Sequence, residues 1–288
     1  MKNSAPADED AAGVQPPGLY IVATPIGNLG DLSPRAARIL ASVAAIACED
    51  TRVTARLLQH IGAKTPMLPY HDHNADAVRP RLIARMGHEA VALVSDAGTP
   101  LISDPGYKLV RDARAAGVTV VTIPGPCAAV AALTLAGLPT DRFLFAGFLP
   151  VKAGAKASAI AEIAAVRASL VFYESAGRTA ATLAALASGL GDRPAAVARE
   201  ISKRFEETVD GSLSTLAARY AEAPPRGEVV IVVGPPPPPA APDTATLDDA
   251  LRDALAQASL SAAASNVAAL LGLPRKTVYA RALELKQP

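Results

Sequence analysis

The apolar residues of the N-terminal half occur in short runs that end at glycine, proline or charged residues. Such runs are typical of strands buried on both faces of a parallel sheet. A helix is predicted after the first run, because Ser33 can cap it, Pro34 suits its first position and the following apolar residues share one face. Strands that alternate with helices predict an α/β domain. The predicted strands are Leu19–Ala23, Ala44–Ala47, Ala90–Ser95 and Val118–Ile123.

A second set of apolar runs begins after Leu138–Asp141, where the first domain is expected to finish. Charged residues border the last three of these runs. The same pattern therefore predicts a second α/β domain. Its strands are predicted at Phe143–Gly147, Ser169–Phe172, Ala195–Ala198 and Val229–Val233.

Two turns rich in glycine and proline stand out in the first domain. One covers Asp96–Gly106, and the other is Pro124–Pro126. A helix from Tyr107 to Ala116, ended by Gly117, is predicted between them. Both turns would leave the carboxyl edge of a parallel sheet, which is where such sheets bind ligands. The composition suits a small polar ligand, although ordinary tight connections in an α/β domain have the same composition.

Polar residues also gather where other predicted strands end. Glu49–Arg52 holds two carboxylates and an arginine, which could begin a helix with a local ion pair or could line the ligand crevice. Tyr70–Asn74 contains His71 and His73, which could ligate a metal. They lie two residues apart on a predicted loop and lack a clear third ligand, so the sequence favours substrate contact or turn chemistry over a metal site.

The C-terminal part of the chain begins with five consecutive prolines, Pro235–Pro239, which predict a stiff spacer. An amphipathic helix is expected from Leu247, and two further helices are expected on either side of a turn at Gly272. This outline resembles a helix-turn-helix with Arg275 and Lys276 on its second helix, although a small bundle that docks on protein would look alike.

The complete predicted division of the chain has five parts. They are a disordered tail at 1–17, an N-terminal α/β domain at 18–141, a C-terminal α/β domain at 142–234, a proline-rich linker at 235–246 and a helical module at 247–288.

Composition narrows the classes of function. The chain has 288 residues with 28 Lys and Arg against 27 Asp and Glu, so its net charge of +1 excludes an extended basic surface for nucleic acid. Its two cysteines, Cys48 and Cys127, form no zinc or disulfide pattern and fit a reduced cytoplasmic location. The tail lacks the apolar core of a signal peptide, and no apolar stretch is long enough to span a bilayer.

Many of these segments together resemble one family. The motifs are LYIVATPIGNL from Leu19, EDTR from Glu49, HDHN from His71, VSDAGTPLISDPG from Val94, PGPCAAV from Pro124, AGLPTDRF from Ala136, GFLP from Gly147, FYES from Phe172, AREISK from Ala198, and the late Gly227-Glu228. Their order across two domains resembles the ribosomal RNA small subunit methyltransferase I family, part of the tetrapyrrole methylase superfamily. The tail resembles that family's helical C-terminal domain.

The resemblance implies transfer of a methyl group from S-adenosylmethionine to the ribose 2′-hydroxyl of a cytidine in small-subunit ribosomal RNA. It also implies a homodimer of chains with two α/β domains and a cofactor cleft between them. By similarity, the cofactor contacts would be Pro25, Asp96, Ala97, Gly98, Thr99, Ile102, Ser103, Cys127, Ala128, Tyr173, Ala198 and Glu228.

The chemistry of such a transfer suggests further residues. A methyl sulfonium is already activated, so orientation and a base or cation at the ribose hydroxyl would help. The candidates for this role are Glu49, Asp50, Glu200 and Lys203, with Glu174 also considered, although ion pairs at strand ends would look the same. The predicted RNA contacts are Arg52, His71, Arg178, Arg199, Arg275 and Lys276.

Two other functions fit parts of the sequence. A methyltransferase acting on a corrin or sirohaem precursor would keep the fold and cofactor, but would have no evident need for a basic helical tail. A DNA-binding regulator with a ligand-sensing body would use the helix-turn-helix, but its second helix carries only a modest charge.

Overall fold

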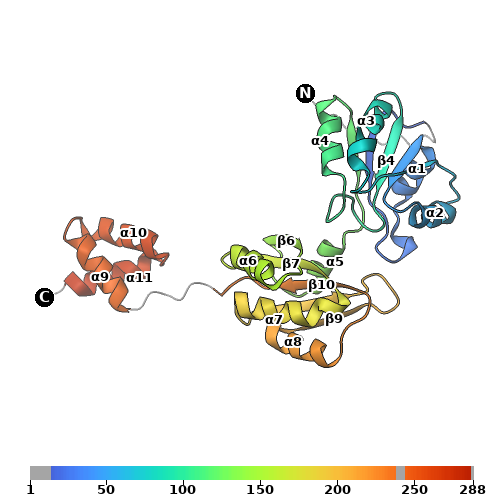
Figure 1. The fold of residues 1–288 in the computed structure, drawn as a ribbon. Coiled ribbons are helices and arrows are strands. Elements are labelled where there is room, and N and C mark those ends of the chain that lie inside the picture. The colour runs from blue at the N-terminus through green and yellow to red at the C-terminus, as the bar shows by residue number, and fades with distance from the viewer. Residues whose placement is uncertain (1–13, 238–243, 287–288) are drawn as a thin grey trace. The chain divides into compact units, whose positions relative to one another are not determined.

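The computed structural model describes residues 14–237 and 244–286, which form two compact units (Figure 1). The first unit ends at Pro236 and holds both sheets, and the second begins at Pro237. Most of the predicted tail, at 1–13, and the centre of the predicted linker, at 238–243, lie outside the described residues.

The first sheet has five parallel strands in the order β3-β2-β4-β1-β5. Its central strands are fully apolar because helices cover both faces. Helices α1 and α2 pack on one face and α3 and α4 on the other. The strands are β1 (Gly18–Val22), β2 (Ala45–Cys48), β3 (Met67–Pro69), β4 (Ala90–Val94) and β5 (Val120–Ile123). The helices are α1 (Pro34–Ser42), α2 (Thr51–His60), α3 (Ala75–Met86) and α4 (Tyr107–Ala115).

The second sheet is mixed, in the order β6-β7-β10-β8-β9, and only β6 and β7 pair in parallel. Helices α6, α7 and α8 cover one face, and α5 (Ala128–Leu135), which follows the first sheet, packs on the other. The strands are β6 (Phe143–Phe148), β7 (Ser169–Ser175), β8 (Pro194–Arg199), β9 (Glu207–Ser212) and β10 (Glu228–Val233). The helices are α6 (Ala153–Ile163), α7 (Thr179–Leu190) and α8 (Leu213–Glu222).

The second unit is a bundle of α9 (Thr244–Leu255), α10 (Leu260–Leu271) and α11 (Arg275–Lys286). Gly272, with φ +65°, ends α10 and makes the turn into α11. A partly buried ion pair supports the bundle, in which Arg281 donates to both carboxylate oxygens of Asp248 at 2.7 Å. The helix pair has the predicted helix-turn-helix outline, and α9 begins at Thr244 rather than at Leu247.

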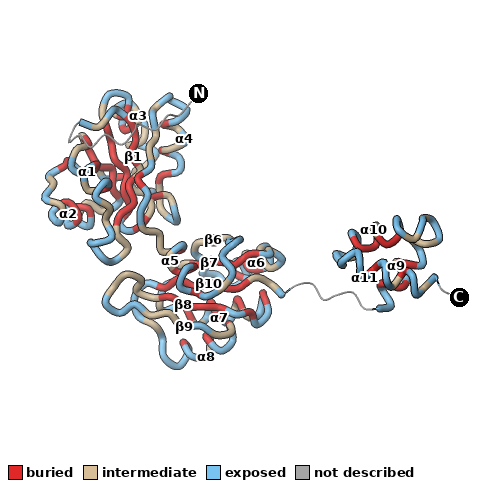
Figure 2. The backbone as a smooth tube through the Cα atoms, turned by 180° about the vertical axis from the view of Figure 1, so that it is seen from behind, coloured by how far each residue is buried: buried red, intermediate tan, exposed pale blue. Residues whose placement is uncertain are grey.

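The predicted fold class is confirmed, and the structure adjusts several boundaries. Ser33 caps α1 and accepts a hydrogen bond from the Ala36 amide, as expected. Strand β5 begins two residues later than predicted, because the Val118 amide instead closes the end of α4 by donating to the Ala113 carbonyl. Strand β9 was not predicted, because its polar sequence gives no apolar run. Figure 2 shows that β1 and β10 are buried along most of their length, as central strands should be.

None of the described helices combines the length and hydropathy needed to cross a membrane.

Candidate functional site

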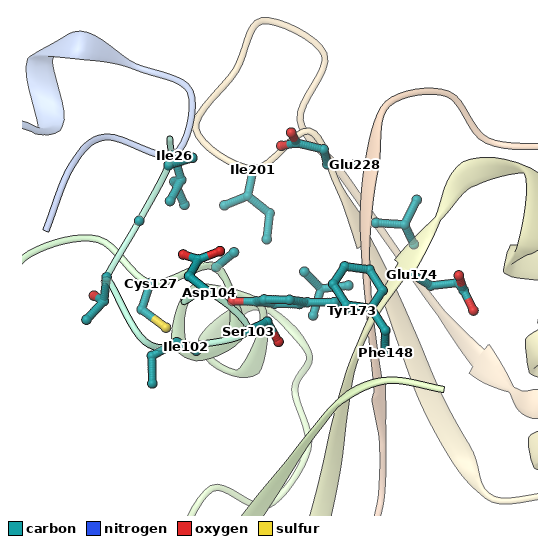
Figure 3. Close-up of a pocket in the computed structure, with 16 residues that line it drawn as sticks. Ile26, Ile102, Ser103, Asp104, Cys127, Phe148, Tyr173, Glu174, Ile201 and Glu228 are labelled. Carbon is teal, nitrogen blue, oxygen red and sulfur yellow. The ribbon is translucent and has the colours of Figure 1, made fainter. Parts of the chain in front are cut away.

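A cavity of about 230 Å³ lies in the first unit, where loops at the carboxyl edge of the first sheet face β7 and β10 (Figure 3). The long turn after β4 and the turn after β5 form one wall. Side chains from the second sheet form the opposite wall. The lining residues are Ile26, Ala97, Gly98, Thr99, Ile102, Ser103, Asp104, Cys127, Ala128, Phe148, Tyr173, Glu174, Ile201, Glu228, Val229 and Val230.

Non-glycine residues with left-handed backbone occur in the loops around this cavity. Leu101 and Ser103 have φ of 75° and 63°, and across the cavity Glu200 and Ser202 have φ of 50° and 65°. These are the non-glycine residues with positive φ in the described part of the chain. Such conformations persist only where neighbouring contacts enforce them, and they are often found at functional sites.

Hydrogen bonds hold the β4 turn in place. Thr24 and Gly98 exchange backbone hydrogen bonds, and the Thr24 hydroxyl donates to the Ser95 carbonyl at 3.2 Å. The Thr99 hydroxyl donates to the Pro126 carbonyl at 2.8 Å, which joins the two predicted turns. The turns after β4 and β5 therefore form a single wall.

Tyr173 connects the second sheet to this wall. Its hydroxyl accepts a hydrogen bond from the Ala129 amide, in the first turn of α5, at 3.2 Å. Its ring meets Phe145 and Phe148 edge to face, with centroids 4.8 and 5.6 Å away. Burial raises the pKa of the Tyr173 hydroxyl, so this group stays neutral.

A second connection joins the loop after β1 to the loop after β8. Ser202 donates to the Asp31 carboxylate, and Lys203 packs so closely on Gly27 that a Cβ there would lie 2.4 Å from Cγ of Lys203. The Lys203 ammonium donates to Glu200 at 3.0 Å and to Glu228 at 2.8 Å. Burial lowers the Lys203 pKa, but these two carboxylates outweigh it and the net shift is upward, so the lysine stays charged.

Most residues predicted to hold the cofactor line the cavity, and three do not. Pro25 precedes Ile26, and the carboxylate of Asp96 accepts a hydrogen bond from the Asp50 amide at 3.0 Å. Ala198 pairs with Val230 on the adjacent strand. The predicted residues that line the cavity are Ala97, Gly98, Thr99, Ile102, Ser103, Cys127, Ala128, Tyr173 and Glu228. The lining residues that were not among the predicted site residues are Ile26, Asp104, Phe148, Ile201, Val229 and Val230.

The predicted catalytic residues Glu49, Asp50, Glu200 and Lys203 lie near the cavity but do not line it. Asp50 caps α2 and is paired with Arg52, whose hydrogen bonds lower the Asp50 pKa to about 2. The Glu228 amide and Lys203 similarly lower the pKa of Glu200. Burial raises the pKa of Glu49, and the charges of nearby aspartates add to this shift. Of the three carboxylates, Glu49 is the one whose pKa is raised.

Glu174 contributes to the cavity wall, but its carboxylate points away from the cavity in Figure 3. It accepts hydrogen bonds from Arg178 at 2.9 Å and from the Thr182 hydroxyl at 2.7 Å, and the side chain is almost fully buried. Thr182 also accepts from Lys156 at 3.2 Å. The Glu174 carboxylate therefore belongs to an internal polar network.

The predicted RNA contacts are distributed over both units. Arg199 pairs with Glu207 at 2.6 Å, and the side chain of Arg52 is 88% exposed. In the second unit, Arg275 donates to two serines of α10, and Lys276 is exposed.

His71 lies on the loop before α3, and its ring centroid is 5.9 Å from that of His73. Its amide donates to the Asn74 side chain at 2.9 Å. No group of three or more metal-binding side chains occurs among the described residues.

A second cavity, of about 270 Å³, adjoins the first. The two share Ser103 and Asp104, which therefore form a common wall. Burial raises the pKa of the Asp104 carboxyl, and Asp96 adds to the shift, whereas a hydrogen bond with Ser95 opposes it. The second cavity is lined by Tyr70, Asp72, Ala75, Asp76, Arg79, Ser103, Asp104, Pro105, Gly106, Tyr107 and Lys108.

The two-sheet fold with its cavity defines a class of protein. Residues 18–217 match the family model described as Tetrapyrrole (Corrin/Porphyrin) Methylases, and residues 241–286 match that of the RsmI C-terminal HTH domain. Among solved structures, uroporphyrin-III C-methyl transferase from Thermus thermophilus in complex with S-adenosyl homocysteine has the same fold. It has a TM-score of 0.53 and 22% identity, over 75% of this chain and 97% of that one.

Proteins with similar sequences show which family within this class the chain belongs to. The chain is 54% identical to a ribosomal RNA small subunit methyltransferase I from Erythrobacter litoralis, over 94% of this chain and 96% of the relative. It is 49% identical to the protein of that name from Mesorhizobium japonicum, over 94% and 92%. The chain therefore belongs to the ribosomal RNA small subunit methyltransferase I family of the tetrapyrrole methylases, as the motifs predicted.

Proposed function

We propose that this methyltransferase transfers the methyl group of S-adenosylmethionine to the ribose 2′-hydroxyl of a cytidine in small-subunit ribosomal RNA. The cavity between the two sheets would hold the methyl donor. The observation that carries this proposal is the chemistry of that cavity, which combines a carboxylate, aromatic rings and apolar walls next to strained turns. The names of the close relatives support RNA as the substrate class.

The cavity suits S-adenosylmethionine, which has a positively charged sulfur and an adenine with apolar faces. None of the described lining residues carries a positive charge, whereas Asp104 and the rings of Tyr173 and Phe148 favour a cation. Ile201, Val229 and other aliphatic side chains suit the faces of a purine. The Ala128 amide, at the start of α5, can donate to a carboxylate.

The work of this chain's residues is chiefly orientation. S-adenosylmethionine supplies an activated methyl group on a sulfonium, so the acceptor oxygen must be held in line with the methyl carbon and sulfur. The strained β4 turn and Tyr173 fix the donor side. A ribose hydroxyl is a weak acid, and Asp104 is the carboxylate that reaches both cavities. We assign Asp104 the role of accepting the hydroxyl proton, which its raised pKa favours.

A tetrapyrrole substrate is not favoured. The neighbours that act on such substrates share only the fold with this chain, as the 22% identity of the uroporphyrin-III enzyme illustrates. The relatives from Erythrobacter litoralis and Mesorhizobium japonicum are 54% and 49% identical over 94% of the chain, and both are named for ribosomal RNA.

The direct test is methyl transfer from labelled S-adenosylmethionine to small ribosomal subunits from cells that lack this protein. We expect label on the 2′-oxygen of one cytidine after digestion and mapping. Incorporation into a porphyrinoid precursor, with none into ribosomal RNA, would instead support the tetrapyrrole alternative.

We also infer that the protein acts in the cytoplasm as a homodimer. The reduced cysteines and a ribosomal substrate fit that location. Exposed apolar side chains near the junction of α5 and β6 are available for a subunit contact, namely Val130, Leu135 and Phe143. Light scattering after size exclusion should give twice the chain mass of 29.4 kDa, and a monomer mass at micromolar concentration would contradict the homodimer.

A further inference from the structure

We propose that the second cavity binds the nucleoside that receives the methyl group, and that it prefers a base with an exocyclic amine. This inference rests on the proposed function and deepens it, because it gives the RNA substrate a defined subsite. Of the predicted site residues, only Ser103 lines this cavity, and it was predicted to contact the cofactor rather than the nucleoside.

The position of the cavity is the first argument. In-line transfer brings the acceptor oxygen to within about 3–3.5 Å of the methyl carbon, so the acceptor must lie directly beside the donor cavity. The second cavity shares Ser103 and Asp104 with the donor cavity. A ribose placed at this shared wall would present its hydroxyl to the donor and to the Asp104 carboxylate.

The shape of the shared wall is maintained by its backbone. Ser103 has φ +63° and Gly106 has φ +136°, so the turn doubles back between the two cavities. A Cβ on Gly106 would lie 3.0 Å from Cδ2 of Leu93, in strand β4. A residue with a side chain would therefore be strained at this position, which lines the second cavity.

The lining chemistry is the second argument. Tyr107, at the start of α4, has 62% of its surface exposed although it borders the cavity, and an aromatic ring at such a site can stack on a base. Asp72 can only accept hydrogen bonds when ionised, which favours a base with an amino group, such as cytosine. Uracil has no exocyclic donor to offer this carboxylate.

The two cations of this cavity have different roles. Arg79 is held by Asp76 and Asp112, each at 2.8 Å, so it maintains the shape of the cavity. Lys108 is about half exposed and lies 3.9 Å from Asp76, a loose contact that leaves its ammonium able to reach a phosphate. The cavity thus offers stacking, amine recognition and a phosphate contact together, which are the requirements of one nucleotide.

The test compares Tyr107→Ala with Tyr107→Phe and the wild-type protein. Loss of the stacking ring should raise the KM for small ribosomal subunits about tenfold or more, whereas phenylalanine should keep a nearly wild-type KM. Binding of S-adenosylmethionine, measured by calorimetry, should be the same in all three proteins, which also verifies that the variants fold.

The outcomes separate the subsite from the proposed function. If the wild-type protein methylates subunits and Tyr107→Ala has an unchanged KM, the second cavity is not the nucleoside site, although the function stands. If the wild-type protein binds S-adenosylmethionine but transfers no methyl group to the subunits, both the proposed RNA substrate and its subsite are wrong.

Discussion

Asp104→Asn is expected to lower kcat for methyl transfer to small ribosomal subunits about a hundredfold, the usual range for loss of a proton acceptor. The amide has the same shape as the carboxylate and keeps the hydrogen bond with Ser95, but it cannot take the hydroxyl proton. Single-turnover transfer with saturating S-adenosylmethionine and subunits would measure this step directly. A rate within threefold of wild type would remove Asp104 from the reaction.

The pH dependence of the methyl-transfer rate tests the role of Asp104 independently. Only the ionised carboxylate can accept a proton, so the wild-type rate should fall as pH decreases through the Asp104 pKa. Burial and the charge of Asp96 raise that pKa, against the hydrogen bond from Ser95, so the fall should begin above the pH expected for an ordinary aspartate, near 3.9. The nearby Glu49 carboxyl also has a raised pKa, so its protonation would produce a similar fall in rate. The fall in rate that is due to Asp104 should be absent from Asp104→Asn and present in Glu49→Gln.

Asp72→Asn provides a matched comparison, because Asp72 lines only the second cavity. It should raise the KM for subunits while kcat stays near the wild-type value. A fall in kcat equal to that of Asp104→Asn would mean that both carboxylates act on the transfer step.

The contrast between Asp96 and Asp104 shows how far the sequence could predict this site. Both occur in one turn of glycines and prolines, and the resemblance pointed to Asp96. The fold separates them, since Asp96 accepts the Asp50 amide whereas Asp104 borders both cavities. Residue type and spacing do not tell which way a loop side chain faces, because the backbone at Leu101 and Ser103 is left-handed and breaks any regular alternation.

The apolar walls were missed for a different reason. Val229 and Val230 belong to an unbroken apolar strand, and a sequence pattern reads them as core. Glu174 shows the converse, because a carboxylate at a strand end looks catalytic until its partners Arg178 and Thr182 are seen. Strands β1, β2 and β4 were easier to recognise, since they are buried along most of their length and give clear apolar runs, whereas the partly buried β3 was not predicted.

Tyr173→Ala is expected to raise the dissociation constant for S-adenosylmethionine about thirtyfold, as loss of a buried aromatic anchor does at binding sites. The ring lines the donor cavity and packs against Phe145 and Phe148, and its hydroxyl accepts the Ala129 amide. Removing it takes away a cavity wall and a connection between the second sheet and α5. Calorimetric titration with S-adenosylmethionine would measure the effect.

Tyr173→Phe separates these two contributions, because it keeps the ring and loses only the hydrogen bond from Ala129. A neutral hydrogen bond contributes about 1 kcal/mol, so the dissociation constant should rise only about fivefold. A thirtyfold loss in both variants would mean that the contact with α5, rather than the ring face, organises the donor cavity. Unchanged affinity in a folded Tyr173→Ala, with melting temperature as the control, would place the methyl donor elsewhere. If the cavity between the two sheets binds the methyl donor, affinity for S-adenosylmethionine should therefore decrease from wild type to Tyr173→Phe and again to Tyr173→Ala.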